Sequence, residues 1–182
     1  MYVDVVIIGA GPAGSCAART AAQAGARVLL LEARRTVGVP VQCAEYVPIR
    51  LRDALGEAWP GEVVVQRVEA MRTFLPDGTV QETPAPGMLI DRAAFDQHLA
   101  RLAVRAGAEL WTGTRAIACS ERGVLARRRD GSVVEIKATV IIGADGPRST
   151  VARWVGILGG WENGRLEQWE SGRVENLSLI HI

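Results

Sequence analysis

The sequence is poor in cysteine, in aromatic residues and in net charge, and the shortages of cysteine and of net charge each argue against a class of protein. Cys16, Cys43 and Cys119 are odd in number and widely spaced, which favours neither a disulfide framework nor a zinc site. The 182 residues include 21 basic and 20 acidic ones, so the formal net charge of +1 does not favour a nucleic-acid binder. Although only 5% of the residues are aromatic, 48% are apolar, as in an ordinary globular domain.

Long hydrophobic runs are also missing. No apolar stretch approaches the roughly 18 residues that a membrane-spanning helix needs. The first four residues have neither the basic segment nor the cleavage site of a secretory signal. We therefore expect a soluble, cytoplasmic protein without a transmembrane segment, and peripheral contact with a membrane stays open. The length fits a single core of about 150 residues and not a large two-domain enzyme.

The chain begins with a segment that predicts a strand, a helix and a second strand. Residues 3–8 are mostly β-branched, as in a parallel strand that is buried on both faces. Residues 12–24 are rich in alanine and are followed by Gly25, which suits a helix end. Residues 26–32 predict a second buried strand. Together these segments predict a βαβ unit, which is right-handed in nearly all known cases.

The remaining chain predicts one more long helix and several antiparallel strands. Prolines and glycines predict a loop over residues 36–60, with a short helix near residues 49–55, and an irregular stretch over residues 83–87. Asp91 is placed to cap an amphipathic helix that ends at Gly107. Strands are expected at residues 63–75, 110–118, 123–129, 132–137 and 139–142. The predicted fold class is α/β, a Rossmann-like βαβ domain with inserted antiparallel strands.

Residues 9–14 contain the pattern G-x-G-x-x-G between the first predicted strand and its helix. In this position Gly9 allows a tight turn, Gly11 lets a pyrophosphate approach the backbone, and Gly14 lets the helix pack closely. The N–H groups at the helix start and the positive end of its dipole then face the phosphates. The motif and its context predict a dinucleotide site.

Glu32 lies at the end of the second predicted strand, where a carboxylate can accept hydrogen bonds from the hydroxyls of an adenosine ribose. A negative charge there would repel a 2′-phosphate, which disfavours NADP in this site. NAD and FAD both keep the free ribose, so the βαβ unit alone leaves both open.

Four segments occur in the order found in the geranylgeranyl reductase family. They are the βαβ unit, residues 37–45 (VGVPVQCAE), residues 91–96 (DRAAFD) and residues 143–149 (GADGPRS). Over residues 1–157 the chain therefore resembles this family of FAD-dependent oxidoreductases, which has a p-hydroxybenzoate-hydroxylase-like fold. The last segment is typical of the wider superfamily, and the cysteine loop points to the reductase branch.

The resemblance implies FAD as the cofactor, NAD(P)H as its transient electron donor and an isoprenoid lipid as the small-molecule substrate, whose double bonds reduced flavin would reduce. At the adenosine end of FAD, it implies contacts from Gly9, Gly11, Ala13 and Gly14 to the pyrophosphate, from Glu32 to the ribose and from the backbone of Ala116 to the adenine. Toward the flavin, it implies contacts from Cys43, Ala44, Arg92, Asp145 and Gly146, with Arg92 at the phosphate-ribityl region. No catalytic residue and no metal ligand is assigned.

Other interpretations of these residues stay open. Cys43 is also compatible with a small, buried apolar side chain that has no role at the flavin. Arg92 is compatible with a solvent-exposed arginine, and Asp145 with a residue that serves only the turn. The three arginines at residues 127–129 fit a solvated surface beside a turn. For the whole chain, the alternatives are an FAD-dependent aromatic monooxygenase, a small NAD-dependent dehydrogenase, and a nucleotide-binding fragment without catalysis.

The chain departs from the family pattern at its end. Family members run roughly as long again, with a later Gly-Asp segment that completes the flavin site. Residues 158–182 contain no such Gly-Asp segment and no sustained periodicity of apolar residues, so we leave them as an unassigned tail. We expect residues 1–157 to form an incomplete, truncated FAD/NAD(P)-binding domain that is inactive in isolation.

Overall fold

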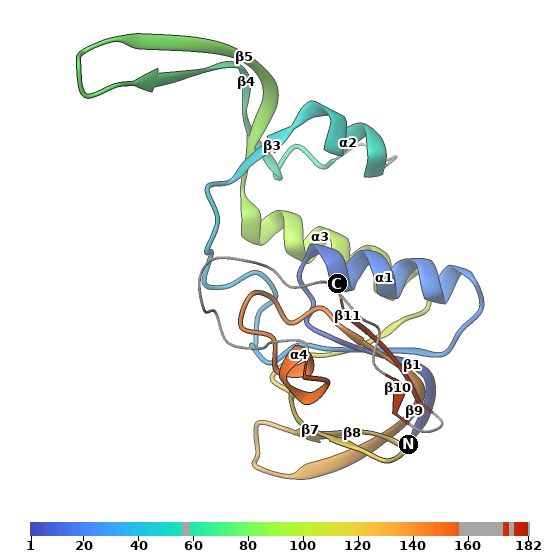
Figure 1. Cartoon of the computed structure of the whole chain (residues 1–182). Coiled ribbons are helices and arrows are strands. Elements are labelled where there is room, and N and C mark those ends of the chain that lie inside the picture. Colours follow the sequence, from blue (N-terminus) through green and yellow to red (C-terminus); the bar gives the residue numbers. More distant parts are fainter. Residues whose placement is uncertain (56–58, 157–172, 175–176, 182) are drawn as a thin grey trace. The chain divides into compact units, whose positions relative to one another are not determined.

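The computed structural model describes residues 1–55, 59–156, 173–174 and 177–181 (Figure 1). The chain divides into two compact units. The sheet unit, as we call it, comprises Met1–Val39 and Asp96–Ile182, and the ribbon unit comprises Pro40–Phe95.

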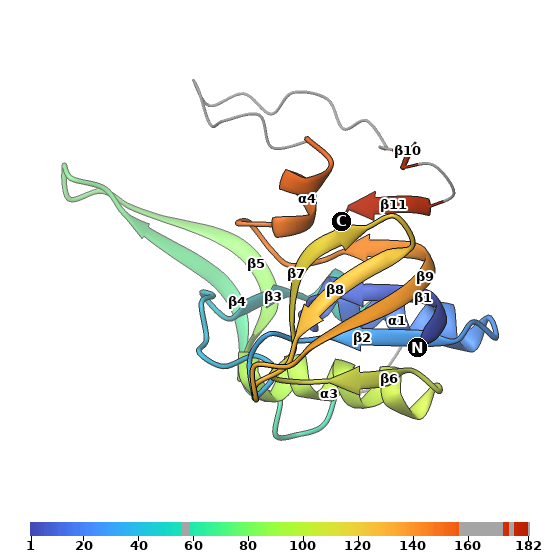
Figure 2. The same cartoon turned by 90° about the horizontal axis from the view of Figure 1, so that it is seen from below.

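The sheet unit contains an eight-stranded sheet with a parallel centre. Its strands are β1 (Tyr2–Ile8), β2 (Val28–Leu31), β6 (Glu109–Trp111), β7 (Arg115–Ser120), β8 (Gly123–Arg127), β9 (Val133–Gly143), β10 (Arg173–Val174) and β11 (Leu177–His181). The order is β10-β11-β9-β1-β2-β6, and β7 and β8 extend from β9 as an antiparallel pair (Figure 2). The strands from β11 to β6 run parallel to their neighbours, as predicted for the βαβ unit.

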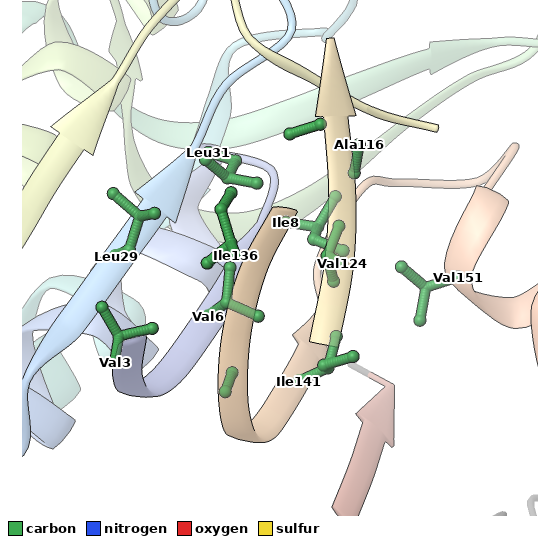
Figure 3. Packing of buried hydrophobic residues seen from close by; sticks show 12 residues of the cluster. Val3, Val6, Ile8, Leu29, Leu31, Ala116, Val124, Ile136, Ile141 and Val151 are labelled. Carbon is green, nitrogen blue, oxygen red and sulfur yellow. The ribbon is translucent and has the colours of Figure 1, made fainter. Parts of the chain in front are cut away.

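Alternate residues of β1 and β2 pack on opposite faces of this sheet. On one face, Ile7 and Leu30 lie in a cluster with Ala18 of α1 (Pro12–Gln23) and Ala103 of α3 (Arg92–Arg105). On the other face, Val6 and its neighbours pack with residues from β8, β9 and α4 (Thr150–Trp154) (Figure 3). Burial on both faces explains the continuous apolar pattern of these strands.

The ribbon unit is built on a three-stranded antiparallel sheet in the order β3-β5-β4. Its elements are β3 (Tyr46–Pro48), α2 (Ile49–Leu55), β4 (Val64–Phe74), β5 (Val80–Ile90) and the first turn of α3. Strands β4 and β5 form a long hairpin (Figure 1). At its base, the rings of Trp59 and Phe95 lie 4.9 Å apart and are tilted by 55°.

Several predicted element bounds are wrong. Residues 83–87 belong to β5 instead of an irregular stretch, and the strand accommodates Pro84 and Pro86 because its register shifts opposite Val68 and Ala70. The predicted strand at residues 110–118 is two strands, β6 and β7, which are separated by a turn in which Gly113 has a φ of +61°.

Two predicted strands are one. Apart from Ser132, the predicted strands at residues 132–137 and 139–142 fall in the continuous strand β9, whose first half pairs with β8 and whose second half pairs with β1. The strands β3, β10 and β11 were not expected. The tail prediction for residues 158–182 falls largely outside the described residues, as does its boundary at residue 157, but β11 pairs in parallel with β9.

The expected cap of the long helix α3 is confirmed. Asp91 caps α3, since its Oδ1 accepts from the N–H of Ala94 at 2.9 Å. None of the three cysteines forms a disulfide. Among the described helices, none is both long enough and apolar enough to cross a membrane.

Candidate functional site

The carboxyl ends of four parallel strands meet at one edge of the sheet unit. In the pairing register, Ile8 lies beside both Leu31 and Gly143, and Leu31 lies beside Trp111. The segments that follow these residues are the glycine loop, Glu32, the β6–β7 turn and residues 144–146. Ligands of open α/β sheets bind at such an edge.

Gly9 and Gly14 are required by the packing of the loop itself. A Cβ on Gly9 would lie 2.3 Å from the carbonyl oxygen of Ala144, and Gly9 has a φ of +102°. A Cβ on Gly14 would lie 1.9 Å from the carbonyl oxygen of Gly9. The glycine loop therefore lies too close to α1 and to the segment that begins at Ala144 for a side chain to fit at either position. Neither glycine needs a ligand to explain it.

For Gly11, the residues that the structure describes offer no such explanation. Its φ of −69° is accessible to any residue, and a Cβ built on it would meet nothing within 4 Å. Gly11 is the N-cap residue of α1, where a residue without a side chain leaves the first N–H groups uncapped. The N–H groups that follow Gly11 at the start of α1 therefore have no side-chain cap, and uncapped N–H donors at a helix start are the groups that bind a pyrophosphate.

Glu32 joins the glycine loop to the end of β2. Its Oε2 accepts from the N–H of Ala10 at 3.0 Å, and its Oε1 accepts from the N–H of Arg34 at 2.8 Å. The Glu32 backbone is also held, because its N–H donates to the carbonyl of Trp111 at 2.8 Å and its carbonyl accepts from the N–H of Thr114 at 2.9 Å. Each carboxylate oxygen keeps a further lone pair for a hydroxyl donor.

Ala116 lies in β7, just beyond the turn between β6 and β7, and is buried. Beside the turn is a hollow of about 680 Å³, which is lined by residues 110–114 and 128–130. Here the guanidinium of Arg128 lies 4.4 Å from the ring centre of Trp111. The arginines at residues 127–129 are exposed as predicted, but Arg128 also covers an aromatic ring. Hydrogen bonds from Ser132 lower the pKa of Asp130, at the rim of the hollow.

Asp145 holds the turn that leads into α4. Its Oδ1 accepts from the hydroxyl of Ser149 at 2.5 Å, and its Oδ2 accepts from the N–H of Thr150 at 2.6 Å. The Ser149 hydroxyl oxygen in turn accepts from the N–H of Ala152 at 2.9 Å. This carboxylate therefore has a structural role, and the adjacent Gly146 is exposed.

The remaining predicted residues lie in the ribbon unit. Cys43 and Ala44 are exposed in the loop before β3, and Arg92 is the first residue of α3. Glu45 contacts both Cys43 and Arg92, since its Oε1 accepts from the N–H of Arg92 at 3.2 Å. The N–H of Glu45 donates to the Sγ of Cys43 at 3.3 Å.

The structure thus brings most of the predicted site residues together at one edge of the sheet unit. These are Gly9, Gly11, Ala13, Gly14, Glu32, Ala116, Asp145 and Gly146. Cys43, Ala44 and Arg92 form their own group in the ribbon unit. Thr114 and Glu45 had no predicted role. Glu45 stands inside the quoted cysteine loop, but no spacing rule links it to Arg92.

Comparison with known proteins agrees with this geometry. The family model for FAD dependent oxidoreductases matches residues 4–157. A protein of Methanosarcina barkeri described as an uncharacterized protein in the nifH2 5′ region is 42% identical over 169 residues, which are 85% of this chain and 88% of that protein. The digeranylgeranylglycerophospholipid reductase of Methanothrix thermoacetophila is 39% identical over 178 residues, which are 92% of this chain and 45% of the reductase.

Solved structures give a similar result. A geranylgeranyl bacteriochlorophyll reductase-like protein from Thermoplasma acidophilum has a TM-score of 0.74 and 29% identity, over 80% of this chain and 39% of that one. The chain thus spans less than half the length of the reductases that it matches. The match to the family model over residues 4–157, together with the glycine loop and Glu32 at the sheet edge, shows that the chain belongs to the FAD-dependent oxidoreductase family.

Proposed function

We propose that the sheet edge binds the adenosine and pyrophosphate part of FAD. In this proposal, Gly9, Gly11, Ala13 and Gly14 form the cradle of the pyrophosphate. The observation that carries the proposal is the open space at Gly11, since no atom of the described residues other than its chain neighbours lies within 4 Å of a Cβ built at that position. A side chain there would fill the space that the phosphates need.

Glu32 binds the adenosine ribose in this proposal. Its carboxylate is already oriented by the N–H groups of Ala10 and Arg34, and it has acceptor capacity left for the two ribose hydroxyls. The backbone of Ala116 lies beyond the turn that holds Glu32, which supports contact with the adenine.

Cys43, Ala44 and Arg92 serve the flavin end of the cofactor, with the Arg92 guanidinium at the phosphate-ribityl region. Asp145 and Gly146 also serve FAD in this proposal, and the hydrogen bonds of the Asp145 carboxylate to Ser149 and Thr150 fix the turn that carries them.

The reaction that we propose for the whole protein is the reduction of isoprenoid double bonds. Support comes from the relatives named digeranylgeranylglycerophospholipid reductase, at 36–39% identity. FAD would supply hydride transfer, with NAD(P)H as the electron donor, while the chain's own residues bind and orient the cofactor. We place this protein in the cytoplasm, with its lipid substrate reached at a membrane surface.

A second candidate is an FAD-dependent aromatic hydroxylase. It is favoured by the structure of OxyS anhydrotetracycline hydroxylase from Streptomyces rimosus, which has a TM-score of 0.67 and 29% identity over 86% of this chain. The two candidates share the adenosine site and differ in the substrate region. Product analysis of the whole protein with an isoprenoid lipid and with a phenol would separate them.

Calorimetric titration of the chain with FAD, ADP and NAD tests the cofactor proposal. We expect FAD to bind more tightly than ADP, and ADP more tightly than NAD. A clear preference for NAD would contradict the proposal and favour a small dehydrogenase. Absence of binding by all three would favour a fragment without nucleotide-binding activity.

A further inference from the structure

Glu45 is the only residue other than glycine with a left-handed backbone in the part of the chain that the structure describes. Its φ is +62°. Glycine or asparagine adopts this conformation more readily than glutamate does. A glutamate in a disfavoured conformation suggests that its side chain is needed there.

All three polar parts of Glu45 make hydrogen bonds within the ribbon unit. Its N–H donates to Cys43 Sγ at 3.3 Å, its carbonyl accepts from the N–H of Ile90 at 2.9 Å, and its Oε1 accepts from the N–H of Arg92 at 3.2 Å. The left-handed backbone turns the chain between Cys43 and β3, whose first residue, Tyr46, pairs with Leu89. Glu45 is half-buried, whereas Cys43 and Ala44 are exposed.

We propose that Glu45 is a positioning residue that fixes the Cys43 loop against the start of α3. This inference rests on the proposed function, in which Cys43 and Arg92 serve the flavin end of FAD. Glu45 then sets the separation of two residues that are 49 positions apart in the sequence, with its N–H on Cys43 and its carboxylate on Arg92. The carboxylate also satisfies an N–H in the first turn of α3, where Asp91 caps a different one.

Amide hydrogen exchange of the ligand-free chain tests the local part of the proposal. Glu45→Ala should raise exchange of the Arg92 amide roughly fivefold to tenfold, because the amide loses its acceptor. Glu45→Gln keeps an oxygen acceptor and should restore protection. Glu45→Gly should expose the Arg92 amide but leave the Ile90 amide protected, since it removes the side chain and suits the backbone. Unchanged exchange at Arg92 in Glu45→Ala would overturn the proposal.

Titrations with FAD and ADP test the link to the cofactor. Glu45→Ala should lower the affinity for FAD about fivefold. It should leave the affinity for ADP at the level of the parent chain, because ADP contacts only the sheet unit in the proposed site. Glu45→Gln should bind FAD nearly as the parent does. The control is Glu69→Ala, which removes an exposed glutamate of β4 and should change neither affinity.

The outcomes separate this inference from the proposed function. Equal loss of FAD and ADP in Glu45→Ala would indicate general misfolding and overturn the positioning role. FAD binding at the level of the parent chain in Glu45→Ala would also overturn the positioning role. A parent chain that binds neither FAD nor ADP would contradict the proposed function, and the exchange measurements would still decide whether Glu45 fixes the loop.

Discussion

Glu32 combines a structural and a proposed ligand-binding role in one carboxylate. Replacement by alanine removes the proposed acceptor of the ribose hydroxyls and the acceptor of the N–H groups of Ala10 and Arg34. A lost hydrogen bond of this kind costs about 1–3 kcal/mol, so Glu32→Ala should lower the affinity for ADP and for FAD by roughly tenfold to a hundredfold. Isothermal titration calorimetry measures this change.

The control for Glu32 should not touch the adenosine end of the site. Arg128 is unsuitable because it covers Trp111, whose carbonyl holds the Glu32 backbone. Glu121→Ala removes an exposed carboxylate at the turn between β7 and β8 and should leave affinity unchanged. If Glu32→Ala folds, as circular dichroism would show, and binds like the parent, the assignment of Glu32 to the ribose is wrong.

The glycines at residues 11 and 14 should respond differently to alanine. Gly14→Ala places a Cβ 1.9 Å from a backbone oxygen and should lower the free energy of unfolding by about 3 kcal/mol or more. Gly11→Ala places its Cβ in open space and should cost about 1 kcal/mol or less. Its FAD affinity should nevertheless fall at least about tenfold.

Urea unfolding and FAD titration on the same two variants check this contrast. Gly25→Ala, outside the site but with a φ of +87°, controls for strain without ligand contact. Stable Gly11→Ala protein that binds FAD normally would mean that the open space beside Gly11 is not the phosphate site.

The start of β1 and the start of β2 are joined by one ion pair. Asp4 Oδ1 accepts from Arg27 Nη2 at 2.8 Å, and Asp4 Oδ2 accepts from the backbone N–H and Nε of Arg27. Hydrogen bonds from the Arg27 side chain and backbone lower the pKa of Asp4 to about 2. Because the folded-state pKa lies below the ordinary value, this pair stabilises the fold above about pH 4 and is lost toward about pH 2.

Asp4→Asn should therefore lower the urea midpoint at neutral pH, and the difference from the parent should vanish as the pH falls through this range. Urea unfolding at a series of pH values from about 7 to about 2 measures this. Glu121→Gln, which changes an exposed carboxylate, is the matched control. A constant difference between Asp4→Asn and the parent would show that titration of Asp4 is not its cause.

At the scale of elements, the sequence predicts what depends on local patterns. The βαβ unit follows from its apolar runs, and Asp91 marks the start of α3. Whether two neighbouring segments form one continuous strand depends on their distant pairing partners and not on the local sequence. Residues 132–142 contain no feature that says where pairing with β8 ends and pairing with β1 begins. The prolines of β5 were misjudged because the register shift opposite them depends on β4.

The same reasoning applies to the site. Gly9, Gly11, Gly14 and Glu32 follow from a motif whose spacing has a physical cause. The double hydrogen bonding of Asp145 and the contact of Glu45 with Arg92 depend on backbone geometry at turns. Such contacts join residues with no fixed spacing, so a single sequence cannot predict them.

As a whole molecule, the chain corresponds to less than half of the reductases that it resembles. We expect the 182-residue chain to bind FAD weakly, to lose it on gel filtration, and to show no NAD(P)H oxidation above that of free FAD. Absorbance at the flavin bands and in the NAD(P)H band measures both. Protein that purifies yellow with stoichiometric flavin and turns over steadily would contradict this expectation.

The central position of β1 has a consequence for biosynthesis. β1 leaves the ribosome before β9 is made, yet one of its edges pairs with β9, where Tyr2 meets Lys137. At about 5–20 residues per second, that edge waits for several seconds to tens of seconds before its partner is made. During this interval the nascent chain exposes an apolar strand with unpaired N–H and C=O groups, which is a binding target for chaperones and a starting point for aggregation.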